Sequence, residues 1–445
     1  MNKMLLIFAL VIGVTFYYTS YAFAGDYMQE IEGLKKRIEE LEKNMEASER
    51  DTKEIKAVNH ELECIKKAFG HLNIGVGITG IVQGTANNDD NNSNVIDGSY
   101  SVDLEIEADM KEWGTAFIHL EAGDGENVAD EVEALTGVNA DALGEQNDLE
   151  VAEAWWEFSL LDEYVTFTVG KLDPVVYWDA NEIANDETAQ FLADIFVNSI
   201  IVEWPDYTPG FHLLVTPNEF LDIRFGILSA DSDWEDIFED IFAAGGIDIK
   251  PKFGNFTGNY RFYGWINALD HIKWNNWLDG ERLNKKAYHD DKVNSGFGLS
   301  FDQQITSDII LFCRFGLQED DIAGESYEYE TNPLRRATLG TEELDPFALR
   351  YSWSIGGQIT GNRWGRPGDV LGIAFGQAII SSDYERYLRD EGVSPEDESH
   401  FEAYYSFRLN ESIAISPDIQ VITNMGGDDD ADTVTVFGVR TQINF

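Results

Sequence analysis

The stretch SYSVDLEIEADM, residues 99–110, constrains the fold more strongly than any other part of the chain. Positions 103, 105, 107 and 109 all carry carboxylates, and the even positions from 100 to 110 are all apolar or aromatic. Successive side chains of a β-strand point to opposite faces. A face with four carboxylates cannot enter a protein core unless those charges find partners. One face of this strand must therefore meet water while the other meets an apolar surface.

The same alternation continues to the C-terminus, and two all-β folds would produce it. A soluble sandwich packs the apolar faces of two sheets together, whereas a transmembrane barrel turns them to lipid and its polar faces to a wet lumen. The segments have roughly the length of ten residues that a tilted bilayer-spanning strand needs. Short connections alternate with long acidic ones, as in outer-membrane barrels. Aromatic residues gather at segment ends, as an interfacial girdle requires: Trp155, Trp156, Trp265, Trp353, Tyr404 and Tyr405.

These features favour an all-β transmembrane barrel of 16 antiparallel strands with an N-terminal coiled-coil helix. The apolar piece NSIIVEW, residues 198–204, is assigned to a long loop, because one more strand would leave the first and last strands parallel. The terminal DTVTVFGVRTQINF then closes the barrel against the first strand. The predicted strands are residues 71–84, 99–110, 114–123, 150–160, 164–171, 209–216, 220–230, 246–252, 259–267, 294–303, 308–318, 348–360, 369–380, 400–409, 412–423 and 432–445.

Two segments precede the predicted barrel domain of residues 71–445. Residues 1–24 have the pattern of a secretory signal peptide, with Lys3 before an apolar run and a small-residue exit that ends at Ala24. Residues 25–70 repeat apolar side chains at alternating spacings of three and four, which predicts a periplasmic coiled coil, although a single amphipathic surface helix remains an alternative. The repeating positions are Ile31, Leu34, Ile38, Leu41 and Met45, then Ile55, Val58, Leu62, Ile65 and Phe69.

Charge and motif content exclude several classes of function. The net charge of −51 argues against nucleic acid or anionic lipid as a partner. The seven histidines show no metal-ligand spacing, and the chain has neither a nucleophile elbow nor a phosphate loop. We therefore predict no enzymatic activity, no cofactor and no metal site. Cys64 and Cys313 are predicted to be unpaired, with Cys313 on the lipid face.

Three stretches resemble the carbohydrate-selective outer-membrane porin family (OprB-type). VAEAWWEFSLLDEYVTFTVGKLDP, from Val151, is a strand, a turn and a strand that ends in the signature Gly170 to Pro174. NRWGRPGDVLGIAFG carries the strand opening at Asp369, Leu371 and Gly372, and FEAYYSFRLNESIAISPDIQVITNMGG resembles the closing hairpin. The terminal Phe445 resembles the end residue of such barrels. The resemblance implies a sixteen-stranded, trimeric channel for sugars or similar small solutes.

The alternation also predicts which side chains line the lumen. The long segment after the fifth strand is the natural candidate to fold inward as a constriction loop, although an external surface loop is the alternative. Its candidate residues are Tyr177, Trp178, Asp179, Glu182, Asp186 and Glu187. The predicted lumen cations are Arg224, Arg261, Arg314, Arg350, Arg408 and Arg440, and the predicted lumen acids are Glu153, Glu157, Asp222, Glu402 and Asp418. Arginines facing acids would create a transverse field, although such pairs could also simply stiffen the wall. Lys171 would point to lipid, so we expect the strand to break after Gly170.

The sequence thus predicts a passive, sugar-preferring porin in the outer membrane of a Gram-negative bacterium, exported by its signal peptide. Its expected partners are small hydrophilic solutes, outer-membrane lipid, further copies of itself in a homotrimer and a periplasmic envelope partner of the coiled coil. Two alternatives stay open. The acidic composition would suit a cation-selective general porin, and the coiled coil would suit a tether for which the barrel is only an anchor.

Overall fold

The computed structural model describes residues 37, 71–87, 94–125, 128–141, 149–235, 237–283, 292–325 and 347–445. The chain divides into two compact units, Met1–His71 and Leu72–Phe445. The predicted signal peptide and, apart from residue 37, the predicted coiled coil lie outside the described residues. Both stay predictions.

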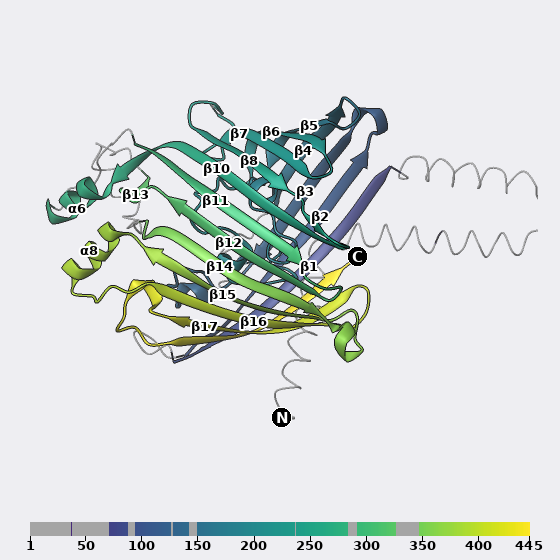
Figure 1. Ribbon diagram of the computed structural model, residues 1–445. Helices are drawn as coiled ribbons and strands as arrows, with labels where there is room; N and C mark the ends of the chain where they lie inside the picture. Colours follow the sequence, from purple (N-terminus) through teal and green to yellow (C-terminus); the bar gives the residue numbers. More distant parts are fainter. Residues whose placement is uncertain are drawn as a thin grey trace, which may run out of the picture. The chain divides into compact units, whose positions relative to one another are not determined.

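Within the described part of Leu72–Phe445, sixteen long antiparallel strands form a closed ring (Figure 1). Each strand pairs with its neighbour along the chain, and β1 pairs with both β2 and β18, so the ring has no free edge. The short strands β9 (Lys252–Phe253) and β13 (Ile322–Glu325) pair only with β10. The predicted number and direction of the strands are confirmed.

The strand bounds agree closely with the predicted ones, and the largest differences are an earlier start of β8 and a longer β10. Residues 198–204 form no strand, as predicted. The long strands are β1 (Leu72–Ala86), β2 (Ile96–Asp109), β3 (Thr115–Asp124), β4 (Glu150–Leu160), β5 (Val165–Leu172), β6 (Thr208–Asn218), β7 (Leu221–Ser229), β8 (Ile241–Ile249), β10 (Phe256–Lys273), β11 (Lys292–Gln304), β12 (Ile309–Gln318), β14 (Leu349–Thr360), β15 (Val370–Ile380), β16 (Glu398–Arg408), β17 (Ile413–Thr423) and β18 (Val434–Asn444).

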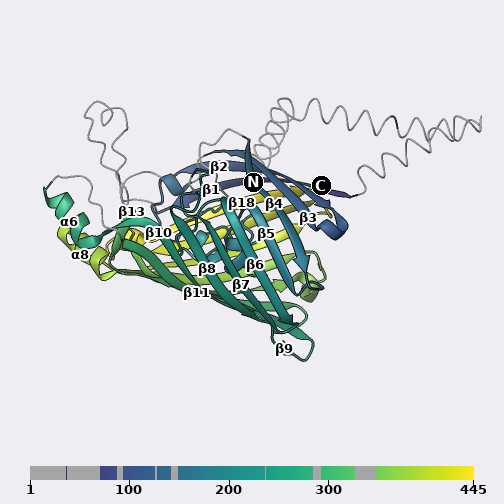
Figure 2. The ribbon, with the colours of Figure 1, turned by 90° about the horizontal axis from the view of Figure 1, so that it is seen from above.

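The two ends of the barrel differ in their connections. The connections at one end are 110–114, 161–164, 219–220, 250–255, 305–308, 361–369 and 409–412, and those at the other end are as long as the longest of these or longer. The long-loop end carries α6 (Trp274–Leu283) and α8 (Ser382–Glu391), which lie side by side in Figures 1 and 2. Trp274 of α6 lies 6.1 Å from Tyr384 of α8 between ring centroids.

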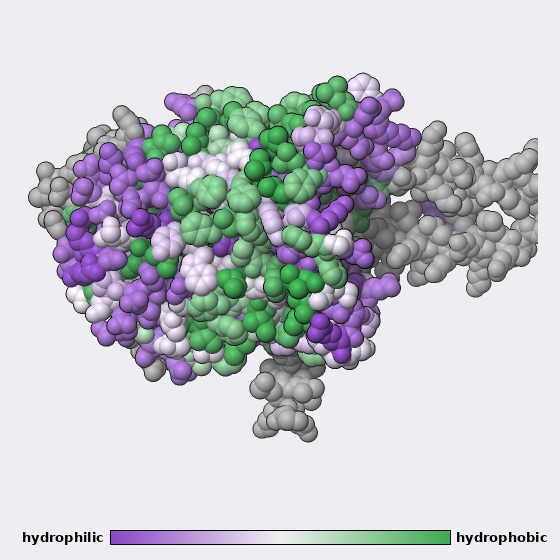
Figure 3. Space-filling view, in the orientation of Figure 1, coloured by the Kyte–Doolittle hydropathy of each residue, from purple (hydrophilic) through white to green (hydrophobic). Residues whose placement is uncertain are grey.

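Burial in the strands is the reverse of that in a soluble protein. On the outer face Ile118, Ile355 and Phe437 are 43–53% exposed, whereas on the inner face Glu402 and Gln420 are fully buried. On the face seen in Figure 3, a hydrophobic band crosses the strands, with hydrophilic surface towards both ends. Among the described residues no helix is both long and apolar enough to cross a bilayer.

The predicted aromatic girdle is only partly correct. Trp156, Trp353 and Tyr405 lie on the outer face, in register with exposed apolar neighbours. Trp265 and Tyr404 are each 2% exposed and belong to apolar clusters inside the barrel, and Trp155 packs against one of them. These three residues belong to the inward rows of β4, β10 and β16, and their rings pack against apolar residues of the barrel interior.

The last strand closes the ring as predicted. The backbone of Phe445 pairs with Val76 of β1, with one amide of each residue donating to the carbonyl of the other at 3.0 and 3.3 Å. Arg440 of β18 points inward and is 1% exposed, whereas Phe437 and Phe445 are exposed on the outside. The terminal aromatic residue thus completes a hydrogen-bond ladder and presents its ring outward.

The connection 361–369 between β14 and β15 is organised around the carboxylate of Asp369. Arg366 forms an ion pair with Asp369 at 2.5 Å, the Tyr405 hydroxyl donates to it at 2.7 Å, and the Arg408 amide donates at 3.1 Å. The hydrogen bond from Arg366 lowers the pKa of Asp369 below its ordinary value. This carboxylate, part of the strand opening noted in the sequence, therefore joins the turn to β16.

We predict that Asp369→Asn lowers the denaturant midpoint of the refolded barrel, because the amide cannot replace an ionised acceptor. A lowered folded-state pKa means that this contribution is complete above the ordinary aspartate pKa of about 3.9 and is lost as the pH falls through the folded-state value. The gap between variant and parent should thus be present at neutral pH and close below about pH 4. Asp308→Asn, whose ion pair with Arg363 spans 3.9 Å, is the control and should change the midpoint less. A gap that persists in acid would contradict this role.

Candidate functional site: the barrel interior

Residues 173–207, the connection between β5 and β6, lie inside the barrel. Asp179 contacts β10 through Tyr263 and β12 through Arg314. Further along, the segment contacts β16 through Glu402 and β18 through Arg440. Since these strands belong to widely separated parts of the ring, the segment extends across the lumen.

The first anchor of this segment is the ion pair between Arg314 and Asp179. Arg314 Nε lies 2.9 Å from Asp179 Oδ2, and the two side chains are 2% and 0% exposed. The guanidinium also donates to the carbonyls of Ala184 at 2.7 Å and Phe196 at 2.9 Å. The Ser199 amide donates to Asp179 as well, at 2.7 Å. Arg314 therefore binds two parts of the segment that are separated in sequence, residues 179–184 and residue 196.

The second anchor uses Glu402 and Arg440. Glu402 accepts from the amides of Leu192 and Ala193 at 2.7 and 3.0 Å, just before α5 (Asp194–Val197). Arg440 donates to the carbonyls of Glu187 and Gln190 at 2.6 and 2.8 Å. Its guanidinium also lies 5.8 Å from the ring centroid of Tyr404. Both side chains thus bind the backbone of the segment.

A second segment, residues 128–141, also enters the barrel and was not anticipated. Glu398 accepts from the amides of Leu135 and Thr136 at 3.0 and 2.9 Å, and from the Thr136 hydroxyl at 2.5 Å. Gln83 of β1 and Gln420 of β17 both donate to the carbonyl of Val138. The alternation of the strands predicts that Gln83, Glu398 and Gln420 face inward. It does not predict that their partners are backbone groups of residues 128–141.

Three other predicted lumen arginines bind partners on neighbouring strands or in their own turn. Arg224 binds Asp248 on the next strand at 2.6 Å and lies 3.8 Å from Asp222. Arg261 binds Asp302 at 2.7 Å. Arg408 donates to the carbonyls of Asn410 and Glu411 in its own turn. Arg314 and Arg440 bind carbonyls of the inward segment, and the transverse field stays a prediction.

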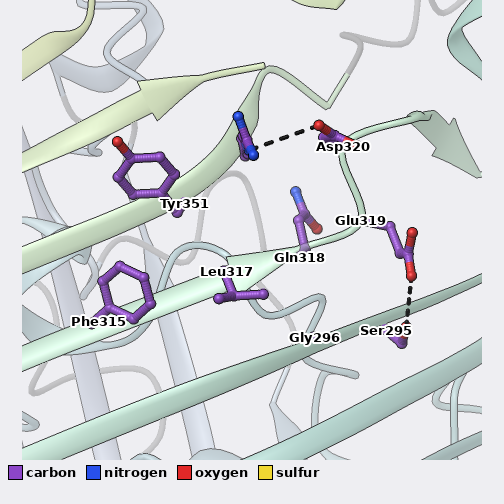
Figure 4. Close-up of a pocket in the computed structure, with 9 residues that line it drawn as sticks. Ser295, Gly296, Phe315, Leu317, Gln318, Glu319, Asp320 and Tyr351 are labelled. Atoms are coloured by element: carbon purple, nitrogen blue, oxygen red, sulfur yellow. Dashed lines mark hydrogen bonds and ion pairs between the residues drawn. The ribbon is translucent and has the colours of Figure 1, made fainter. Parts of the chain in front are cut away.

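Arg350 is an exception to the alternation of inward and outward side chains. A β-bulge shifts the register between Leu349 and Tyr351, so Arg350 leaves the inward row. Its side chain is 55% exposed, lies 3.7 Å from Asp320 and lines a pocket with the outward-facing Phe315 and Leu317 (Figure 4). The prediction that Arg350 lines the lumen is therefore wrong.

The remaining predicted acids serve different partners. Glu153 accepts from Trp155 Nε1 at 3.1 Å, Glu157 from the Thr168 hydroxyl at 2.9 Å, and Asp418 from Gln420 at 3.1 Å. Asp222 binds Lys250 at 2.5 Å. Of these acids only Asp222 has an ion pair with a predicted arginine.

The predicted constriction residues separate into buried and accessible ones. Trp178 and Asp179 are 1% and 0% exposed, so neither can contact a passing solute and that prediction is wrong for both. Tyr177 is half-buried against the ring of His212, at 4.2 Å between centroids. The Glu182 side chain is exposed, Asp186 caps its own turn through Thr188, and Glu187 is half-buried.

The strands β2 to β4 contribute inward side chains of a distinct kind, which we call the acidic–aromatic wall. The rings of Phe117 and Trp155 stack at 4.9 Å between centroids, and Glu153 accepts from Trp155. His119 lies 3.0 Å from Asp103. The wall comprises Asp103, Glu105, Glu107, Phe117, His119, Glu121, Glu153 and Trp155.

Lys171 lies at the edge of this region. The strand β5 continues to Leu172, so the predicted break after Gly170 is wrong. Gly170 has a φ of 145°, a value that favours glycine and bends the strand there. Lys171 then donates to the carbonyl of Val151 at 2.8 Å and lies 5.9 Å from the ring centroid of Tyr207. Among the described residues no group of His, Cys, Asp and Glu side chains could hold a metal ion.

We predict that Arg314→Met releases the inward segment. Removing one partner of a buried ion pair costs about 3–5 kcal/mol, because the other charge stays buried and unpaired. Single-channel conductance in planar bilayers should rise and its open-state noise should increase. Arg224→Met removes a charge from the wall but not from the segment, so it should leave the conductance near that of the parent. Equal conductances for parent and Arg314→Met would contradict the anchoring role.

Comparison with known proteins agrees with this architecture. A family model described as "Carbohydrate-selective porin, OprB family" matches residues 87–445. The solved structure of OprB from Pseudomonas putida is 14% identical, covers 86% of this chain and 97% of its own, and superposes with a TM-score of 0.69. A BenF-like porin from Pseudomonas fluorescens is 9% identical over 84% of this chain and 99% of its own, with a TM-score of 0.45.

An uncharacterized protein of Aquifex aeolicus is 36% identical over 84 residues, which are 19% of this chain and 27% of that protein. The matched segment thus spans about a quarter of the curated relative. The family match, by contrast, extends over most of the barrel and ends at Phe445. The chain belongs to the carbohydrate-selective OprB family and is an outer-membrane porin.

Proposed function

We propose that this porin allows passive diffusion of small hydroxyl-rich solutes and prefers carbohydrates. Family membership supports the class of solute. The observation that carries the proposal is the stacked pair of Phe117 and Trp155 beside the carboxylate of Glu153. Aromatic faces stack on the apolar faces of sugar rings, and carboxylates accept hydrogen bonds from sugar hydroxyls.

In this proposal the interior residues have two kinds of role. The acidic–aromatic wall contacts the solute, together with Glu157, Tyr177 and Glu182. Arg314, Arg440, Glu402 and Asp179 act indirectly, because they fix the inward segment that opposes the wall. A fixed segment keeps the narrow section at one width, which a selective pore requires.

We predict that Trp155→Ala weakens block of the single-channel current by a neutral oligosaccharide about two- to tenfold, since an aromatic stacking contact contributes about 0.5–1.5 kcal/mol. The matched control is Trp156→Ala, which removes the same ring from the next position on the opposite face, where Trp156 is 39% exposed. That variant should leave the block unchanged. Equal effects of both variants, or of neither, would reject the wall as a sugar contact.

A cation-selective general porin is the second candidate. It is favoured by the carboxylates of the wall, Asp103, Glu105, Glu107, Glu121 and Glu153, because the guanidinium groups of Arg314 and Arg440 are engaged with backbone carbonyls. Carboxylate-lined pores concentrate cations. Reversal potentials under a salt gradient separate the two: strong cation selectivity without any block by added sugar would replace the carbohydrate proposal with this one.

The predicted coiled coil of residues 25–70 lies outside the described part of the chain, except for position 37. The homotrimer and the envelope-tethering role also remain predictions. We propose that this segment contributes to assembly or tethering and not to permeation. Removal of residues 25–70 should accordingly leave single-channel conductance unchanged.

A further inference from the structure

A third contact holds the inward segment of residues 173–207, close to its return to β6. His271 of β10 and Asn294 of the neighbouring strand β11 are both 0% exposed, and both bind Glu203 of the segment. The Nε2 atom of His271 lies 3.0 and 2.8 Å from the two carboxylate oxygens of Glu203. Asn294 Nδ2 donates to the same carboxylate at 3.1 Å. Glu203 thus joins the segment to two adjacent strands of the wall.

The other nitrogen of the His271 ring also faces an acceptor. Nδ1 lies 3.1 Å from the carbonyl oxygen of Lys292. A neutral imidazole has one N–H and one lone pair, whereas the charged ring has two N–H groups. Only the charged ring can therefore donate to both partners. A neutral ring would direct a lone pair at the carboxylate of Glu203 or at the carbonyl of Lys292, whichever nitrogen had lost the proton.

Several other charged residues belong to this site, but they titrate in a different range. Together with Glu203 they are Asp270 and Lys273 of β10, Lys292 of β11, Glu319 and Asp321 after β12, and Glu325, which β13 places opposite His271 in the register. The ammonium of Lys292 lies 3.5 and 3.1 Å from the carboxylates of Glu319 and Asp321. Aspartate, glutamate and lysine side chains keep their charges from about pH 5.5 to 9, so the imidazole is the group that titrates in this range.

Other contacts hold the preceding stretch of the segment against the wall. A Cβ atom at Gly316 of β12 would lie 2.6 Å from Ser199 Oγ and 3.1 Å from Ile201 Cβ, so residues 199–201 lie directly against this strand. The Ser199 amide donates to Asp179 of the first anchor, and Ile201 is 2% exposed. This part of the segment is therefore fixed by packing and by its backbone, independently of His271.

We propose that His271 is a positioning residue of the pore, which fixes the outer end of the inward segment while its ring is doubly protonated. When the ring loses a proton as the pH rises, one of its two hydrogen bonds is replaced by a repulsive contact between lone pairs. Residues 203–207 then move more freely at the long-loop mouth, whereas the part held by Arg314 and Asp179 keeps its place. This device does not depend on which solute the pore prefers.

The test is the single-channel current of the full-length porin in planar bilayers, recorded from about pH 5.5 to 9. We expect the open-state noise of the parent to rise with pH and to fall again on acidification. His271→Gln should abolish the pH dependence, because an amide does not titrate. Glu203→Gln should shift the midpoint of the rise to lower pH by about one to three units, since an opposite charge favours the protonated ring. This nearly isosteric variant also serves where His271→Gln does not refold.

The matched control is His212→Gln. His212 of β6 is 2% exposed and contacts the same segment, with its ring 4.2 Å from that of Tyr177 between centroids. Among the described residues neither of its ring nitrogens has a hydrogen-bond partner, so this variant should keep the pH dependence of the parent. Parent noise that is constant with pH, a pH dependence that survives in His271→Gln, its loss in His212→Gln, or an unshifted midpoint in Glu203→Gln would each overturn the proposal.

Discussion

The requirement that every strand in a bilayer hydrogen-bond both of its edges governs this structure. No water is available in the hydrocarbon region to satisfy a free edge, so the sheet must close. The closure depends on the pairing of β1 with β18, which extends to the last residue of the chain. Once the ring is closed, the outer and inner rows of side chains are fixed along every strand. The hydrophobic band and the polar interior both follow from that one constraint.

The interior is not simply a wet tube with charged walls. Two segments of chain, residues 128–141 and 173–207, occupy it and bring apolar residues with them. Aromatic side chains from the inner rows, such as Phe312 and Tyr404, therefore pack in a core within the lumen. The buried polar side chains of Arg314 and Glu402 are stable there because each has hydrogen-bond partners in the interior segment, and Arg314 also has the carboxylate of Asp179.

The sequence was sufficient to predict the barrel because its signal is local and repeated. Alternation of apolar and polar residues, the lengths of connections and the parity of the strands determine the fold without any knowledge of distant contacts. The same rule failed at Arg350, where one extra residue in a β-bulge reverses the side on which a side chain lies. A separate prediction, based on the composition of the long segment after the fifth strand, expected Trp178 and Asp179 to meet solute, whereas both are buried. Their burial depends on Leu228, Tyr263 and Arg314, residues far away in the chain. Periodicity predicts on which face of a strand a side chain lies, but not which residues pack against that face.

The position of the anchors in the chain has a consequence for the order of folding. Glu398 and Glu402 both lie on β16, and they hold segments that precede them by more than 200 residues, at separations of 262 for Thr136 and 210 for Leu192. Arg440 binds Glu187 across 253 residues. The amides of Leu135, Thr136, Leu192 and Ala193 and the carbonyls of Glu187 and Gln190 therefore lack these partners until the last strands have been made and brought into the ring. Such distant contacts form late and slowly. The width of the pore is thus set at the end of assembly, by the same strands that close the wall.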